Sequence, residues 1–264
     1  MSIVVCLKWV SHPGEPHDSR FSGMSHADQS ALEFALQQAE STGATVTAIT
    51  VGPPGAEKVL RDALACGAHH AVRIEGPTTT SGTDVATAIA DHITDARWVW
   101  CGDYSLDRGA GSVPAFIAAH LNAQQALGII HASIEGDAVH ATRRLDGGRR
   151  ELLEVTAPAV VSVEGATARL RRATLAAVRA AASATIPVVS ATTPMHRAEF
   201  MVRPYRPRAR VLPAPEGATA LERLRVLTDA AAASAARGDT VRLEPADAAA
   251  RIVRALREWG YLAH

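Results

Sequence analysis

Short apolar runs alternate with helical patterns over residues 1–101, and this alternation constrains the fold more than any other feature of the chain. The apolar runs have strand length and lie at 3–7, 44–51, 70–74 and 98–101. Apolar residues recur at helical spacing between them, first at Ala31, Leu32, Ala35, Leu36 and Ala39 and then over 56–66. Strands that alternate with helices of about 10–15 residues form βαβ units around a parallel sheet. The sequence therefore predicts an α/β fold built on a parallel sheet.

Helix ends and loops can be assigned within this pattern. Gly43 and Gly67 follow the first two helical segments and are expected to end them, while Asp84 is expected to cap a third helix after a loop at 78–82. Parallel sheets bind ligands beyond the carboxyl ends of their strands. We therefore expect a ligand site among the loops after residues 7, 51 and 101. Lys8 ends the first apolar run and faces either that site or solvent.

The segment 133–163 has a different character. Strand-like residues at 139–144 and 151–155 flank a turn at 146–148, and a further strand is expected at 159–163. These strands look antiparallel. They predict an antiparallel extension at one edge of the sheet.

The regular alternation weakens after about residue 183. Arginines and five prolines occupy 194–215, which is typical of a linker, and two helices are expected beyond it, at 218–237 and from Pro245 to Gly260. The last helix has an apolar stripe at Ile252, Val253, Leu256 and Trp259. The sequence thus predicts a domain over 1–185 and a linker with a C-terminal helical arm for partner docking over 186–264.

Charge is distributed unevenly along a chain whose formal net charge is zero. Residues 1–140 have 15 acidic and 7 basic side chains, whereas 141–210 have 5 acidic and 13 basic ones. The basic segment has no interleaved aromatic residues and no nucleic-acid-binding signature, so we expect no nucleic-acid partner. A contact surface for an acidic partner and an ordinary solvated face both remain possible interpretations.

Several other classes of protein are disfavoured. Cys6, Cys66 and Cys101 lack the spacing of a disulfide framework or metal cluster, and buried thiols are expected. His26 and the pair at 69–70 have no clustered carboxylates, so no metal site is expected. No apolar run reaches the roughly 18 residues of a membrane span, and no secretory signal is recognisable, which predicts a cytoplasmic protein without stable membrane insertion.

The loop over 102–113 is the strongest local candidate for a binding site. It follows an apolar run, contains Gly109, Gly111 and Ser112, and precedes a helical pattern at 115–121. Unpaired N–H groups at a helix N-terminus suit a phosphate, and glycine permits a close approach of the backbone. The same residues would also form a purely structural turn. Neither GxGxxG nor GxxxxGK[ST] is present.

A more specific motif follows at 141–162. It reads Ala141, one residue, Arg143, two residues, Asp-Gly-Gly, two residues, Glu151, one residue, Leu153, four residues and then Pro-Ala-Val-Val-Ser at 158–162. This order resembles the β-subunit signature of electron transfer flavoproteins at every defined position. Further segments are similar to that family in the same order, namely 5–10, 24–28, 50–53, 60–68, 102–113 and, loosely, 252–262.

The resemblance implies a Rossmann-like adenine-nucleotide-binding domain in the β subunit of a heterodimer. Such a subunit binds AMP, or a second FAD in electron-bifurcating relatives, while an α subunit holds the redox-active FAD; it carries electrons from a dehydrogenase and is not itself an enzyme. Carried over position by position, the cofactor site comprises Cys6, Ser25, His26, Ala27, Asp28, Val51, Gly102, Asp103, Tyr104, Ser105, Leu106, Asp107, Arg108, Gly109, Ala110, Gly111, Ser112 and Val113.

This sequence departs from the family pattern at several of these positions. Ser25 replaces Asn, His26 replaces Pro, 107–109 is not an acidic triplet, and Gly-Ser-Val-Pro at 111–114 replaces N-Q-T-G. Despite these departures the resemblance still predicts where the site lies, but it does not predict which ligand the site binds. Residues 186–215 show no likeness to the family's dehydrogenase-recognition loop, so the usual acyl-CoA dehydrogenase partners are in doubt.

Two alternatives belong to other functional classes. A stand-alone nucleotide-binding regulatory or stress protein would need a GxxGxxxxG-type loop near the end of the domain, which is absent. An enzyme that uses nucleophilic or acid–base catalysis would need a Ser/His/Asp or paired-carboxylate arrangement, and none is evident.

Overall fold

The computed structural model describes residues 2–10, 22–77, 80–105, 107, 109–136, 138–192, 215, 217–227 and 241–262. The chain divides into two compact units, residues 1–201 and residues 202–264. The first unit contains the sheet and its covering helices, and the described residues of the second include two helices.

Within the described residues, the first unit is built on one nine-stranded sheet. Its strands are β1 Ser2–Cys6, β2 Thr45–Gly52, β3 His70–Glu75, β4 Trp98–Gly102, β5 Gln124–Glu135, β6 Ala138–Arg144, β7 Arg150–Thr156, β8 Ala159–Val163 and β9 Val188–Ser190. Their order is β7-β6-β5-β8-β4-β1-β2-β3-β9. All neighbouring pairs from β5 to β9 are parallel, and the pairs β5–β6 and β6–β7 are antiparallel. The predicted parallel α/β fold with an antiparallel edge is therefore confirmed.

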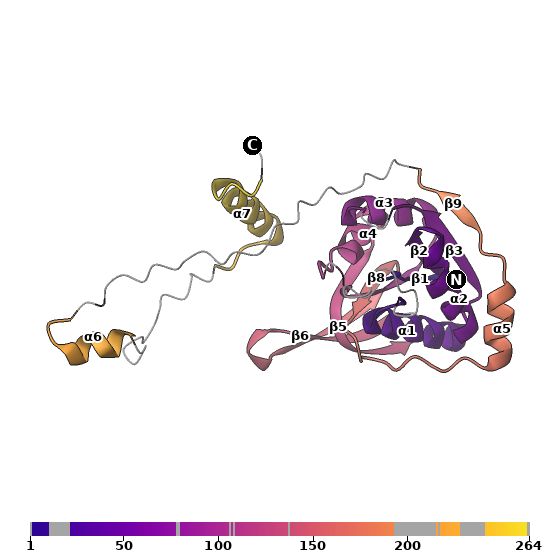
Figure 1. Ribbon diagram of the computed structural model, residues 1–264, viewed down its shortest axis with the longest axis horizontal. Coiled ribbons are helices and arrows are strands. Elements are labelled where there is room, and N and C mark those ends of the chain that lie inside the picture. Colours follow the sequence, from indigo (N-terminus) through magenta and orange to yellow (C-terminus); the bar gives the residue numbers. More distant parts are fainter. Residues whose placement is uncertain are drawn as a thin grey trace. The chain divides into compact units, whose positions relative to one another are not determined.

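Helices cover both faces of this sheet. They are α1 His26–Thr42, α2 Glu57–Cys66, α3 Gly82–His92, α4 Val113–Leu121 and α5 Leu175–Ser183. The apolar sides of α1 and α2 pack on one face and those of α3 and α4 on the other, and α1 and α3 lie on opposite sides of the strands in Figure 1. Alternate residues of the strands point to opposite faces, so parallel strands covered on both sides must be apolar throughout. The runs 3–7 and 98–101 satisfy this requirement.

An aromatic contact and a hydrogen bond join helix α1 to strand β4. The rings of Phe34 and Trp100 stack with their centroids 5.3 Å apart. The Trp100 Nε1–H donates to Oε1 of Gln38 at 2.8 Å, so the buried indole N–H has a hydrogen-bond acceptor. Gly43 ends α1 and Gly67 ends α2 in the left-handed conformation, as predicted from their positions after the helical patterns.

The antiparallel hairpin gives a physical reason for the motif at 141–162. Strands β6 and β7 place Arg143 directly opposite Glu151, and the Arg143 Nε–H donates to Oε2 of Glu151 at 2.8 Å. Gly147 and Gly148 in the connecting 3₁₀ turn have φ of 71° and 74°, a region that favours glycine. The basic, Asp-Gly-Gly and acidic positions of the motif thus specify a hairpin and its cross-strand ion pair.

Some expected elements were wrong or missed. The predicted antiparallel strand 159–163 is β8, which lies inside the sheet and pairs in parallel with β4 and β5. The helix after the 78–82 loop is capped by Ser81, whose Oγ accepts the N–H of Asp84, so Asp84 lies in the first turn instead of at the cap. Strand β5, helix α5 and strand β9 were not predicted, and β9 adds residues 188–190 to the sheet, beyond the expected domain end at 185.

The second unit contains α6 Ala220–Leu227 and α7 Pro245–Glu258. The expected continuation of the first of these helices to residue 237, and most of the linker 194–215, lie outside the described residues. Helix α7 starts at Pro245 as predicted and buries none of its side chains. In the part of the chain that the structure describes, no helix combines the length and apolar character that crossing a membrane requires.

Candidate functional site

The strand order reverses between β1 and β4, which is where a sheet of this kind is expected to bind its ligand. From β1 the chain continues through β2 to β3 on one side, and it then crosses back so that β4 lies on the other side of β1. In such sheets the connections that leave the two adjacent strands turn in opposite directions and open a crevice beyond their carboxyl ends. The N-terminus of α1 and the loop after β4 border this crevice, which brings the two longest predicted site segments together.

Asp28 lies at the bottom of this region. Ser25 caps α1, and its Oγ accepts the backbone N–H of Asp28 at 3.1 Å. The Asp28 Oδ2 accepts the backbone N–H of Lys8 at 3.0 Å, so the first turn of α1 is joined to the end of β1. Asp28 is only 6% exposed. Burial raises the pKa of Asp28 to about 7, against the opposing effects of these hydrogen bonds and of the Lys8 charge.

Glycine at position 102 is required by this buried carboxyl group. A Cβ atom on Gly102 would lie 2.4 Å from Oδ1 of Asp28 and 2.9 Å from its backbone nitrogen. Any other residue at the end of β4 would therefore displace Asp28 or α1.

Lys8 faces the site, which decides the question that the sequence left open. Its Nζ lies 2.7 Å from Oδ1 of Asp107 and donates to Oγ of Ser105 at 3.1 Å. Partial burial raises the pKa of Asp107, but hydrogen bonds from Lys8 and Ser105 outweigh this effect, and the net pKa is lowered. Lys8 therefore connects the end of β1 to the loop that follows β4.

Asp103 has an unsatisfied carboxyl oxygen beside the crevice. Its backbone N–H donates to the carbonyl of Val163 at 3.0 Å, which holds the loop against β8. Its Oδ1 is buried and has no hydrogen-bond partner among the described residues. Partial burial and the nearby charge of Glu164 raise the pKa of this carboxyl group. A carboxyl oxygen of this kind fits a hydroxyl or amino donor of a ligand.

Two glycines shape the loop. Gly109 and Gly111 have φ of 61° and 58°, and a Cβ atom on Gly111 would lie 2.3 Å from the carbonyl oxygen of Asp103. The N–H of Gly109 donates to the carbonyl of Ser105 at 2.8 Å. At the N-cap of α4, Ser112 makes no side-chain capping bond, so the first N–H groups of that helix depend on other partners. Glycine at 109 and 111 thus fits the left-handed backbone of this loop, and at 111 also the close approach of the Asp103 carbonyl.

The remaining predicted residues occupy varied positions. Cys6 is buried directly opposite Cys101. A hydrogen bond with Cys6, together with burial, raises the pKa of Cys101, so this thiol is held protonated.

The other predicted residues differ in exposure. Ala27 is buried, His26 and Tyr104 are exposed, and Val51 packs in the apolar cluster beside α3 and α4. Ala110 is exposed and Val113 begins α4, whereas Leu106 and Arg108 lie outside the described residues. Cys66 is half-buried, unlike the other two cysteines.

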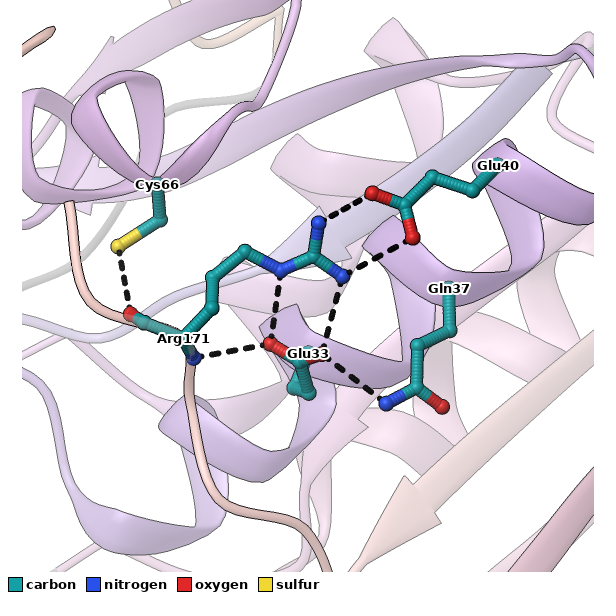
Figure 2. Close-up of polar contacts among 5 residues, drawn as sticks. All are labelled: Glu33, Gln37, Glu40, Cys66 and Arg171. Carbon is teal, nitrogen blue, oxygen red and sulfur yellow. Dashed lines mark hydrogen bonds and ion pairs between the residues drawn. The ribbon is translucent and has the colours of Figure 1, made fainter. Parts of the chain in front are cut away.

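A second polar cluster, centred on Arg171, holds α1 in place (Figure 2). The Arg171 Nη2 lies 3.0 Å from Oε1 of Glu33, and the Arg171 backbone N–H donates to Oε2 of the same residue at 3.0 Å. The guanidinium also pairs with Glu40, and the Arg171 carbonyl accepts from the Cys66 thiol at 3.6 Å. Sequence reasoning missed this cluster because the basic segment was interpreted as a partner surface or a solvated face.

A comparison with protein families identifies the family of the chain. The profile of the electron transfer flavoprotein domain matches residues 18–194, which is more than half of the chain. The chain belongs to the electron transfer flavoprotein family. Its similarity is to β subunits: it is 31% identical to electron transfer flavoprotein subunit beta of Clostridium acetobutylicum over 176 residues. The family predicted from the motif at 141–162 is thereby confirmed.

Other relatives have related names. The chain is 30% identical to Protein FixA of Azorhizobium caulinodans and 32% identical to the acryloyl-CoA reductase electron transfer subunit gamma of Anaerotignum propionicum. These alignments include 72% and 51% of this chain and 75% and 53% of the respective relatives, and the clostridial alignment includes 61% and 68%. Some relatives are thus matched over only about half of their length.

A solved universal stress protein in complex with cAMP matches 46% of this chain and 89% of its own. The identity is 24% and the TM-score is 0.31, values that support no inference about ligand or function.

Proposed function

We propose that this chain is the β subunit of a heterodimeric electron transfer flavoprotein, an electron carrier that binds AMP or a second FAD in the crevice between β1 and β4. An α-type subunit holds the redox-active FAD and completes the path from a dehydrogenase to an acceptor. The membership of the electron transfer flavoprotein family is the observation that carries this proposal. A cytoplasmic location stays a prediction from the sequence.

The residues of the crevice fit an adenine nucleotide. Gly102 and Gly111 let the loop after β4 pack closely against Asp28 and against its own backbone at Asp103. The Asp103 Oδ1, which has no partner among the described residues, suits a ribose hydroxyl or an adenine amino group. The bound flavin would supply the redox chemistry, while the side chains described here would bind and orient the nucleotide. No group of three or more potential metal ligands occurs among the described residues.

Exposed apolar side chains on helix α7 support the proposal of a protein partner. Ile252 is 60% exposed, Trp259 is 69% exposed, and Val253 also remains exposed. Large apolar side chains of an amphipathic helix gain stability when they are buried, by about 1.5–3 kcal/mol each. We therefore assign the predicted docking role of the C-terminal arm to this stripe and the α-type subunit to its partner.

Co-purification tests the proposal. The full-length chain is co-expressed with an α-type protein encoded beside it, and FAD and AMP are counted per complex with the flavin absorption spectrum. We expect a heterodimer with redox-active FAD that depends on the α-type subunit, and a colourless chain when it is purified alone. If no heterodimer forms, the proposal is wrong. A yellow chain that binds one FAD tightly by itself would overturn the assignment of the redox flavin to the partner.

A further inference from the structure

Lys8 contacts two segments of the candidate site, which suggests a role beyond the structure of β1. Its backbone N–H binds Asp28 at the N-terminus of α1, and its side chain reaches Asp107 and Ser105 in the loop after β4. Lys8 thus contacts both segments that border the crevice, and its ammonium group lies where they meet.

Lys8 supplies a positive charge in a region that contains three aspartate side chains. Asp28, Asp103 and Asp107 belong to the two segments of the candidate site, and Glu164 acts electrostatically on Asp103. Among the described residues, Lys8 is the cation that acts on both Asp28 and Asp107. An anionic ligand that enters a crevice bordered by carboxylates needs a compensating positive charge.

The bond that holds Lys8 is weak enough to exchange. The Lys8 and Asp107 side chains are 38% and 32% exposed, and ion pairs of this kind contribute about 0–1 kcal/mol. A phosphate group carries more negative charge than a carboxylate and offers more acceptor oxygens, so it competes well for the same ammonium group. Toward Lys8, the Asp107 carboxylate and a phosphate are equivalent in kind, because both offer anionic oxygens that accept hydrogen bonds from the ammonium group.

We propose that Lys8 is the phosphate-binding cation of the site and that a nucleotide phosphate replaces Asp107 as its partner. This inference rests on the proposed nucleotide-binding function and specifies which part of the ligand is bound ionically. It makes a phosphate, and not the nucleoside alone, the feature that this crevice selects.

The amino-acid composition provides a selective test. Lys8 and Lys58 are the only lysines in the sequence, and Lys58 donates to the Ser22 carbonyl at 2.6 Å on the side of α2. Limited acylation of the full-length chain, read by peptide mass spectrometry, therefore reports on two lysines. We expect AMP to slow the modification of Lys8 at least severalfold and to leave Lys58 unchanged, whereas adenosine should protect neither. Equal protection of Lys8 by adenosine would overturn the role of the phosphate.

Calorimetry with AMP and adenosine gives a second, independent measurement. Lys8→Gln should weaken AMP binding about tenfold or more, toward the affinity for adenosine, and leave adenosine binding unchanged, because a charge-assisted hydrogen bond is lost. Asp107→Asn should preserve or increase AMP affinity, and Lys58→Gln is the matched control. Unchanged AMP affinity in Lys8→Gln overturns this inference alone. If the unmodified chain binds neither AMP nor FAD at this site, in isolation and in the heterodimer, the nucleotide site itself is overturned and this inference with it.

Discussion

The region at the end of β4 and the helix α7 differ in which side chains are buried: a polar group is buried in the first, and apolar groups are exposed in the second. Beside the crevice, a carboxyl group that prefers water is buried under Gly102, and the cost appears as a pKa of about 7 for Asp28. In α7, indole and aliphatic side chains that prefer burial are exposed. The first arrangement is completed within the chain, whereas we propose that the second is completed by the α-type partner. Substitutions in the two regions should therefore differ in what they change: stability in one and association in the other.

Gly102→Val should have the largest effect on stability. The added side chain would overlap Asp28, which cannot move without shifting the N-terminus of α1. We expect a loss of more than about 4 kcal/mol of unfolding free energy, or failure to fold. Gly23→Ala is the control, because a Cβ atom there meets nothing within 4 Å. Denaturant unfolding of both variants makes the measurement, and a stable Gly102→Val chain would contradict the buried position of Asp28.

Asp28→Asn should give the next largest effect, and its sign depends on pH. Because the folded-state pKa of about 7 is above the ordinary value of 3.8, wild-type stability falls as pH rises between these values. At pH 8 the buried carboxylate costs on the order of 4 kcal/mol. Asparagine avoids this cost, so the variant should be more stable than the wild type at pH 8 and close to it near pH 4. Parallel stability curves for the two proteins between pH 5 and pH 8 would contradict the burial of an ionisable group.

Arg171→Gln should have an intermediate effect. Its partner Glu33 is only 8% exposed at the side chain and would lose its cation, which typically costs about 1–3 kcal/mol. Arg144→Gln is the matched control, because the Arg144 side chain in its pair with Glu164 is 65% exposed and such pairs contribute less than about 1 kcal/mol. Urea unfolding of both variants gives the comparison. Equal losses would show that α1 does not depend on the Arg171 cluster.

Substitution of Ile252 and Trp259 by Asp should have the smallest effect on stability. Both side chains are exposed, so we expect a change in melting temperature of the full-length chain that is close to zero. Binding to the α-type subunit should be lost at the same time, as measured by size-exclusion chromatography of the mixed proteins. A double variant that melts early yet binds its partner with full affinity would place the stripe in the chain's own core.

The sequence predicted those features that depend on local patterns. Alternating apolar runs indicated the parallel sheet, Gly43 and Gly67 marked helix ends, and the Asp-Gly-Gly motif indicated the hairpin of β6 and β7. It gave the wrong direction for 159–163, because proximity to a hairpin in the sequence does not determine which strands a segment joins. In this fold β8 crosses to the centre of the sheet and pairs with β4.

The sequence by itself determined the fold class and the family motif, since these depend on residue periodicity, turn chemistry and short spacings. Only the tertiary structure decided how the charges are paired. Lys8 meets Asp107 across 99 residues, and Arg171 meets Glu33 across 138 residues. The pKa of Asp28 likewise depends on burial beneath Gly102. Interactions over such separations depend on the order of the strands and on the packing of helices, and no local pattern in the chain specifies them.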